Sequence, residues 1–186
     1  MLMYQNGDTD AFEILYRRYE KHLLDFIYRM VMNLSEAENL YQETFYRVIK
    51  SKKKYKVTAQ FKTWLFQIAI NLCRDSFRKM KHRSHLSLNA HTTSQNDEGV
   101  EYHEFISNPS ADTAKQVESE ELGFLVKAAI ASLPEKEHLV VILKEYQGMK
   151  FSEIADTLNC PIGTALSLNH RAQDKLKKIL SKYIGD

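Results

Sequence analysis

The sequence predicts an all-α protein: two small helical domains joined by a flexible acidic linker, the second containing a helix-turn-helix. Three observations predict this. The chain of 186 residues has only 6 Gly and 3 Pro, too few for a turn-rich β protein. Apolar residues recur at helical spacing on both sides of a polar middle section. Charge is divided too: residues 1–85 hold 16 Lys and Arg against 9 Asp and Glu, whereas residues 86–126 hold 1 against 8.

The first domain, residues 1–83, is expected to contain three helices. The first begins near Asp10, whose side chain can cap free backbone N–H groups, with Glu13 three positions later. The second covers residues 35–50, and its opening Ser-Glu-Ala-Glu reads as a capping box. The third runs from about residue 61 to residue 81. Their apolar sides can form one modest core.

A lysine loop separates the second and third of these helices. It contains Lys52, Lys53, Lys54, Tyr55 and Lys56. The helix after it begins with aromatic residues, among them Trp64, and ends in a basic stretch. Aromatic faces stack on unpaired bases while cations hold phosphates, so the pattern predicts binding of a separated nucleic-acid strand. Two simpler interpretations stay open: the loop is only a solvated turn, and Trp64 is only a core residue.

The helix over residues 35–50 also carries an acidic face. Its members are Glu36, Glu38, Asn39, Gln42 and Glu43. Acidic residues near a helix start suit the positive end of the helix dipole. Taken alone, this face is equally consistent with a solvated surface and with a docking surface for a protein partner.

Residues 84–118 are expected to form the linker. They are polar, lack hydrophobic periodicity and contain Asn-Pro and Asp-Glu-Gly. The segment is long for a loop inside one domain, which favours a domain boundary here. Its plainest interpretation is a flexible tether.

The second domain, residues 119–186, is expected to be helical again. One helix covers residues 119–132 and the next ends at residue 147. A short helix over about 152–158, a tight break over 159–163 and a longer helix to about 182 predict a helix-turn-helix. The candidate DNA contacts on it are Ser152, Thr164, Ser167, His170 and Arg171.

Several of these motifs together resemble the extracytoplasmic-function (ECF) group of bacterial RNA polymerase sigma factors, in the sigma-70 family. Residues 42–45 (Gln-Glu-Thr-Phe) and residues 151–155 match the family closely, and Asn71, Asp75 and Arg78 reproduce its Asn-x-x-x-Asp-x-x-Arg spacing. The resemblance covers nearly the whole chain. It implies a dissociable subunit that binds core RNA polymerase and promoter DNA and directs transcription initiation.

The resemblance also implies roles for individual segments. The acidic face docks on the clamp coiled-coil of the largest polymerase subunit, and the linker threads the active-site cleft and the RNA exit channel. The lysine loop holds a base flipped out of the minus-ten element. Asn71 pairs with a base edge, and Arg78 takes a phosphate, oriented by Asp75. Arg74 and Lys79 belong to the same DNA-binding set.

The recognition helix departs from the family pattern. The family typically reads Pro-x-Gly-Thr-Val-Lys-Ser-Arg, whereas residues 161–168 read Pro-Ile-Gly-Thr-Ala-Leu-Ser-Leu. Leu166 and Leu168 thus replace two basic residues of a DNA-facing helix. We expect weakened minus-thirty-five recognition and a contact through these leucines with a partner, either a DNA-bound recruiting protein or an anti-sigma factor. The alternative is a rotated helix, in which Leu168 takes a core position.

Other classes of site find little support in the sequence. Cys73 and Cys160 lie far apart, so neither a disulfide framework nor a zinc site is expected, and no metal or cofactor is predicted. No signal peptide or membrane span is visible, and a bacterial cytoplasmic location is expected. No nucleophile–base pair or Gly-rich phosphate loop indicates an enzyme.

Two rival functions stay open at this point. A stand-alone helix-turn-helix regulator that binds duplex DNA would explain residues 135–180 but would leave the lysine loop without a role. A DNA-processing enzyme would use the basic first domain for its substrate. It would lack the carboxylate cluster that metal-dependent phosphodiester chemistry needs.

Overall fold

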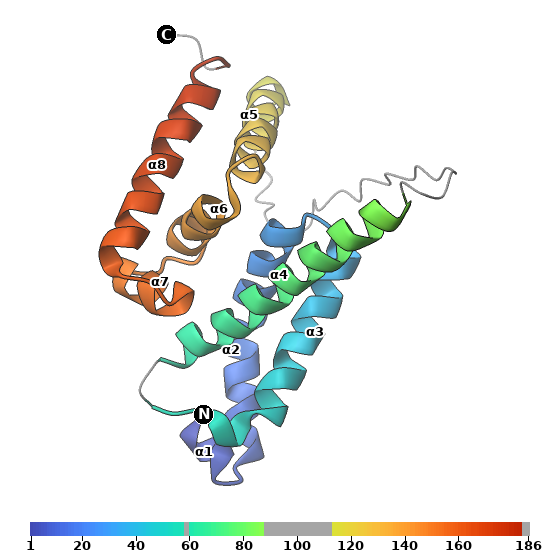
Figure 1. Ribbon diagram of the computed structural model, residues 1–186, viewed down its shortest axis with the longest axis vertical. Coiled ribbons are helices and arrows are strands. Elements are labelled where there is room, and N and C mark those ends of the chain that lie inside the picture. The colour runs from blue at the N-terminus through green and yellow to red at the C-terminus, as the bar shows by residue number, and fades with distance from the viewer. Residues whose placement is uncertain (58–59, 88–112, 184–186) are drawn as a thin grey trace.

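The computed structural model describes residues 1–57, 60–87 and 113–183, and every element within these ranges is a helix (Figure 1). The all-α prediction is therefore confirmed for the described chain. Helices α1 to α4 form the first half of the molecule, and α5 to α8 form the second half.

The first half consists of α1 (Leu2–Gln5), α2 (Thr9–Val31), α3 (Leu34–Lys50), the 3₁₀ turn η1 (Lys52–Lys54) and α4 (Phe61–Ser87). The three long helices pack against one another, each burying an apolar stripe. Fully buried side chains at the centre of this core are Leu23, Phe26, Ile27, Val48, Leu65 and Phe66. This packing fixes the rotation of α3 and α4, and therefore which of their residues face outward.

The starts of α2 and α3 differ from the expectation. Asp8 rather than Asp10 caps α2, and Asn33 rather than Ser35 caps α3. In both cases the side-chain oxygen accepts a hydrogen bond from the backbone N–H three residues later, at 3.0 Å and 2.9 Å. Both true caps have extended backbone, which lets the side chain fold back on the first turn. The predicted capping box therefore lies inside α3.

The second half consists of α5 (Thr113–Ala131), α6 (Glu135–Val141), the π-helical turn η2 (Ile142–Tyr146), α7 (Phe151–Leu158) and α8 (Ile162–Leu180). The π-helical turn closes with a hydrogen bond from the N–H of Gln147 to the carbonyl of Ile142, at 3.2 Å. The helix that was expected to continue to residue 147 is therefore α-helical only to Val141 and π-helical after it. The core of this half includes Leu139, Ile142, Leu143, Met149 and Ile154.

Helices enter both ends of the segment that was expected to be the linker. Helix α4 continues to Ser87 and α5 already begins at Thr113, so both enter the range 84–118. Residues 88–112, the rest of that range, lie outside the described residues.

The two halves touch each other. Helix α7 lies beside the first part of α4 (Figure 1). The π-helical turn η2 packs on α2. The Nζ of Lys62 donates a hydrogen bond to the carbonyl of Gln147 at 2.8 Å, and the Nε2 of Gln67 donates to the carbonyl of Asp156 at 2.9 Å. The start of α4 is thus hydrogen-bonded to the backbone of the second half.

Candidate nucleic-acid interface

The lysine loop leaves the end of α3 through η1 and presents its ammonium groups unequally. Lys53, Lys54 and Lys56 are exposed, whereas Lys52 is half-buried. The Nζ of Lys52 lies 4.6 Å from the ring centroid of Tyr4, a cation–π distance. Three of the predicted lysines therefore face solvent, while Lys52 also contributes to the fold.

Tyr55 and Trp64 sit in an aromatic cluster where the loop meets α4. Their ring centroids are 5.2 Å apart, and both rings lie about 6 Å from that of buried Phe61, at 6.1 Å and 6.0 Å. Tilted ring pairs of this kind are each worth about 0.5–1.5 kcal/mol beyond area burial. Trp64 packs against the core and is still partly exposed, so the core role is observed and stacking on a base stays a prediction.

The remaining predicted contacts of the first half lie along α4. Asn71, Arg78 and Lys79 are exposed. Asp75 Oδ1 lies 3.0 Å from the guanidinium of Arg78, which fits the predicted orienting role. The pair is largely solvent-exposed and contributes little to stability. Asn71 follows Trp64 by seven residues, two helical turns, so both lie on one side of α4, and the contact between the Tyr55 and Trp64 rings joins that side to the loop.

The structure divides the acidic face of α3. Glu38, Asn39 and Gln42 are exposed. Glu43 is partly buried, and its carboxylate lies 2.8 Å from the Nε of Arg47, one turn later on the same helix. A docking surface on α3 is therefore centred on the three exposed residues, with Glu43 at its edge.

Glu36 does not share the exposed part of that face. Its Oε1 accepts a hydrogen bond from the Oγ of Ser76 on α4, at 2.6 Å. The residue precedes buried Ala37 and lies one turn before buried Leu40, so the rotation of α3 turns it toward α4. The carboxylate of Glu36 thus joins two helices of the bundle, and its contact with polymerase stays a prediction.

Helices α7 and α8 meet at a tight turn in which Asn159 adopts the left-handed conformation, with φ 52°. The five predicted DNA contacts on this unit are all exposed: Ser152, Thr164, Ser167, His170 and Arg171. Ser167 Oγ donates to the carbonyl of Gly163 at 2.8 Å, and His170 Nδ1 lies 3.1 Å from Asp174. The helix-turn-helix is therefore formed as predicted, with polar groups on its outer side.

Leu166 and Leu168 lie in different environments. Leu166 is 47% exposed, whereas Leu168 is only 6% exposed and belongs to the core with Ala165 and Ala172. The predicted partner contact is wrong for Leu168, and the rotated-helix alternative describes its position. Asn169 is buried beside it, and its side-chain oxygen has no hydrogen-bond partner among the described residues.

Comparison with known proteins decides the family. The family model for sigma-70 region 2 matches residues 15–83, and the model for sigma-70 region 4 matches residues 124–176. The ECF RNA polymerase sigma factor SigW of Bacillus subtilis is 32% identical over 176 residues, which cover 95% of this chain and 92% of that protein. This chain belongs to the ECF group of the sigma-70 family.

Other relatives match this sigma factor over similar lengths. The RNA polymerase sigma-H factor of Pseudomonas aeruginosa is 30% identical over 189 residues, covering 98% of this chain and 92% of that protein. The ECF sigma-E factor of Escherichia coli K12 is 30% identical over 172 residues, covering 92% and 87%. The chain directs transcription initiation with core RNA polymerase on promoter DNA, and neither rival function is favoured.

Two solved structures share its fold. Bartonella quintana RpoE, in complex with the anti-sigma factor NepR, aligns with a TM-score of 0.70 and 21% identity, covering 95% of this chain and 100% of that one. CnrH, in complex with the cytosolic domain of CnrY, aligns with a TM-score of 0.69 and 19% identity, covering 98% and 95%. At these identities the likeness concerns the fold alone.

Arg74, a predicted DNA contact of this sigma factor, forms an ion pair between the two halves. Its Nε lies 2.7 Å from the Oε1 of Glu135, at the start of α6 in the other half. A carboxylate and a phosphate oxygen would compete for this Nε donor. While this pair is formed, a phosphate contact by the Nε of Arg74 is blocked, and only the terminal N–H groups of the guanidinium are left to make one.

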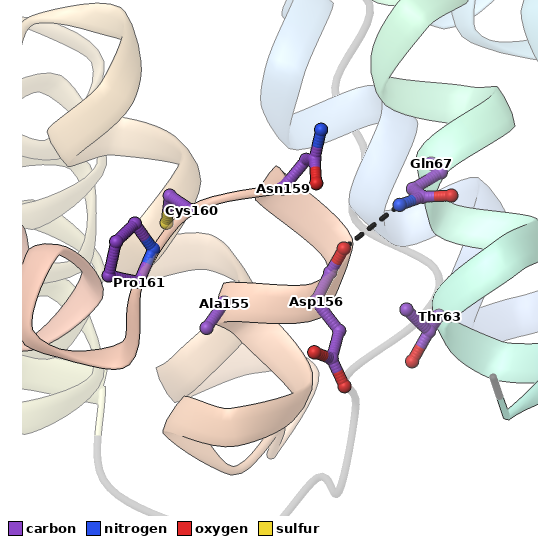
Figure 2. Close-up of a pocket in the computed structure, with 7 residues that line it drawn as sticks. All are labelled: Thr63, Gln67, Ala155, Asp156, Asn159, Cys160 and Pro161. Atoms are coloured by element: carbon purple, nitrogen blue, oxygen red, sulfur yellow. Dashed lines mark hydrogen bonds between the residues drawn. The ribbon is translucent and has the colours of Figure 1, made fainter. Parts of the chain in front are cut away.

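An open cavity of about 450 Å³ lies between the two halves (Figure 2). Its walls are Thr63 and Gln67 of α4 and, from the helix-turn-helix, Ala155, Asp156, Asn159, Cys160 and Pro161. The hydrogen bond from Gln67 to the Asp156 carbonyl crosses its edge, as Figure 2 shows. The cavity marks the boundary between the halves, and its side chains do not converge on one point.

The described residues contain no group of three or more His, Cys, Asp or Glu side chains placed to hold a metal ion. Cys73 and Cys160 are free thiols, and burial raises the pKa of Cys73 to about 12. None of the described helices has the length and apolar character needed to cross a bilayer. Sigma factors are not an enzyme family.

Gln5 and Glu135 are among the residues that contact the predicted DNA-binding groups and that sequence reasoning missed. Gln5 hydrogen-bonds to the lysine loop, 47 residues later, and Glu135 pairs with Arg74, 61 residues earlier. The short helix α1 was not expected either. No local pattern marks contacts between segments so far apart in sequence.

Proposed function

We propose that this sigma factor divides promoter recognition between its halves. Residues 1–83 dock on the clamp coiled-coil of the largest polymerase subunit and open the minus-ten element. Residues 84–118 act as an acidic linker through the active-site cleft and the RNA exit channel. Residues 119–186 contact the minus-thirty-five region with the help of a partner.

One observation carries the proposal: the lysine loop meets α4 at the Tyr55–Trp64 ring contact, on the side of α4 that carries Asn71 and Arg78. Lys53 and Lys54 are exposed at one end of it, and the partly exposed ring of Trp64 follows. Asn71 lies about 10 Å farther along α4 and Arg78 a similar distance beyond it. A separated strand needs cations for its phosphates and flat or amide groups for its bases, which this surface supplies in order.

Docking on polymerase is assigned to a different helix. Glu38, Asn39 and Gln42 are exposed on α3, and none of the cations assigned to DNA lies on that helix. Clamp binding and strand binding then use separate faces and can occur together. Acidic and amide side chains on a docking face suit a basic partner surface.

The second half supports a weaker role in DNA binding. Thr164, Ser167, His170 and Arg171 can hold phosphates, but exposed Leu166 stands where the family favours a cation. Each phosphate contact that is lost lowers affinity and reduces its salt dependence by nearly one unit. A DNA-bound recruiting protein that covers Leu166 completes this proposal.

The proposal includes a bacterial cytoplasmic location and no catalytic activity of the chain itself. Core polymerase works in that compartment and carries out the RNA chemistry. The solved relatives RpoE and CnrH are complexed with the anti-sigma factor NepR and with the cytosolic domain of CnrY, respectively. An anti-sigma partner for this chain is proposed on that basis.

The test is reconstitution with core polymerase on promoter templates that carry a fluorescent base in the minus-ten element. Replacing Lys53 and Lys54 by Ala should weaken opening on all sequences and lower the salt slope by about 2. Asn71→Ala should change preference at one base by about 1–3 kcal/mol.

The matched control replaces Lys177 and Lys178, two exposed lysines near the end of α8, by Ala. This variant should open the minus-ten element like the wild type. An Asn71→Ala variant with unchanged opening and unchanged base preference would show that its assigned role is wrong.

A further inference from the structure

The four-residue helix α1 contacts the backbone of the lysine loop. The Nε2 of Gln5 donates hydrogen bonds to two loop carbonyls, that of Lys52 at 2.5 Å and that of Tyr55 at 2.9 Å. These carbonyls stand at the two ends of the segment that holds Lys53 and Lys54. One side-chain amide thus spans the whole turn.

Helix α1 is itself anchored to the bundle. Tyr4 is 8% exposed, and its ring centroid lies 4.8 Å from that of Phe12 on α2. Phe12 in turn lies 6.2 Å from Phe45 on α3. The Lys52 ammonium group also lies over the Tyr4 ring, in a cation–π contact. Gln5 therefore projects toward the loop from a rigid support.

The loop has a physical need for such a support. Its four lysines repel one another, which favours extended and varied shapes over a tight turn. A glutamine amide is suited to hold it, because it is neutral and offers two N–H groups. Lysine or arginine at position 5 would add another positive charge beside the loop.

We propose that Gln5 is a positioning residue for strand capture. Its amide holds the turn in the shape that directs Lys53 and Lys54 toward the displaced strand. The inference rests on the proposed role of the loop in minus-ten opening. Gln5 acts only through the loop backbone. Its loss therefore removes no lysine from the loop, but it lets the turn sample other shapes.

The experiment compares the full chain with Gln5→Met, which keeps the side-chain length and removes both donors. Hydrogen exchange of the loop amides is measured in the free protein, and minus-ten opening is measured with core polymerase. We expect faster exchange over residues 53–56 and opening weakened on the order of tenfold, the scale of two lost hydrogen bonds. The salt slope and the affinity for polymerase should stay unchanged, because no charge is removed.

The matched control is Met3→Gln, the reverse exchange on the same helix at a side chain that is 63% exposed. It should behave like the wild type in both measurements. Wild-type opening by Gln5→Met would overturn the proposal, as would an equal loss of polymerase affinity, since that marks a general folding defect.

The two readouts also separate this inference from the proposed function. If the wild-type chain opens no promoter, the proposed function fails. If the wild type opens promoters normally and the loop amides of Gln5→Met exchange at the wild-type rate, only the positioning role is overturned.

Discussion

The two halves of this sigma factor place their DNA-facing groups on different kinds of element. In the first half, Lys53 and Lys54 extend from a loop that buries neither side chain. In the second half, α8 must supply both a core and an outer surface, so Leu166 is exposed and Leu168 is buried only two residues later. A loop can concentrate like charges, whereas each position on a packed helix is assigned by its rotation.

The halves also differ in whether the groups that we assign to DNA contact the other half. Helix α4 contacts α7, and Arg74 of α4 pairs with Glu135 of α6. The outward groups of α8, among them Thr164 and Arg171, are exposed. Part of the proposed minus-ten surface is therefore in contact with the second half, while the helix-turn-helix keeps its outer polar groups in solvent.

The largest expected effect distinguishes the two leucines of α8. Leu168→Ala should destabilise the second half by about 2–5 kcal/mol, because it leaves a cavity in the core. Leu166→Ala, the matched control, should change stability by no more than about 0.5 kcal/mol. Denaturant unfolding is followed by circular dichroism for the whole chain and by the fluorescence of Trp64, the only tryptophan, for the first half.

The circular dichroism transition of Leu168→Ala should move to lower denaturant and the fluorescence transition should move less. Equal stability of the two variants would show that α8 is not rotated as described. It would also restore Leu168 as a candidate partner contact.

The next effect concerns the acidic face of α3. Reversing Glu38 and Glu43 to Lys should weaken binding to core polymerase on the order of 2 kcal/mol, about thirtyfold, because like charges would meet across the interface. Co-purification and titration with core polymerase measure it, with helical content as a check on folding.

Glu13→Lys on α2 is the control for that variant. Glu13 is exposed and pairs with Arg17 one turn later, as Glu43 pairs with Arg47. Each variant breaks a comparable surface pair, so a loss of polymerase binding seen only in the α3 variant is not caused by breaking such a pair. Undiminished polymerase binding by the α3 variant would remove α3 from the docking surface.

The elements that sequence predicts well are those with local signals. The helices, the lysine loop and the helix-turn-helix follow from periodicity and charge, and the all-α fold is confirmed. The structure differed from the expectation where neighbouring residues competed for one capping position, or where segments distant in sequence came into contact. Asp8 and Asn33 took the capping roles assigned to later residues, and Glu36 turned toward α4 because buried Ala37 fixes the rotation of α3.

A smaller effect is expected for the ion pair between the halves. Arg74 and Glu135 are both partly exposed, so a double-mutant cycle with Arg74→Gln and Glu135→Gln should give a coupling of about 0.2–1 kcal/mol in unfolding. Glu135→Gln alone should strengthen promoter binding severalfold, because it releases the guanidinium. A coupling of zero would mean that the pair does not hold the halves together in solution.

The smallest effect is a pH dependence confined to the second half. His138 is buried in α6, and burial lowers its pKa below the ordinary value of 6.5. The unfolded chain therefore takes up a proton at a higher pH than the folded chain does. The stability linked to neutral His138 is fully present above about pH 6.5 and is lost as the pH falls through the lower, folded pKa.

Thermal unfolding from pH 8 to pH 5 should therefore show a steeper loss for the wild type than for His138→Gln. His22→Gln, at an exposed position on α2, should retain the wild-type slope. The change should appear in circular dichroism before Trp64 fluorescence, and identical slopes for all three proteins would show that His138 is not held neutral by the fold.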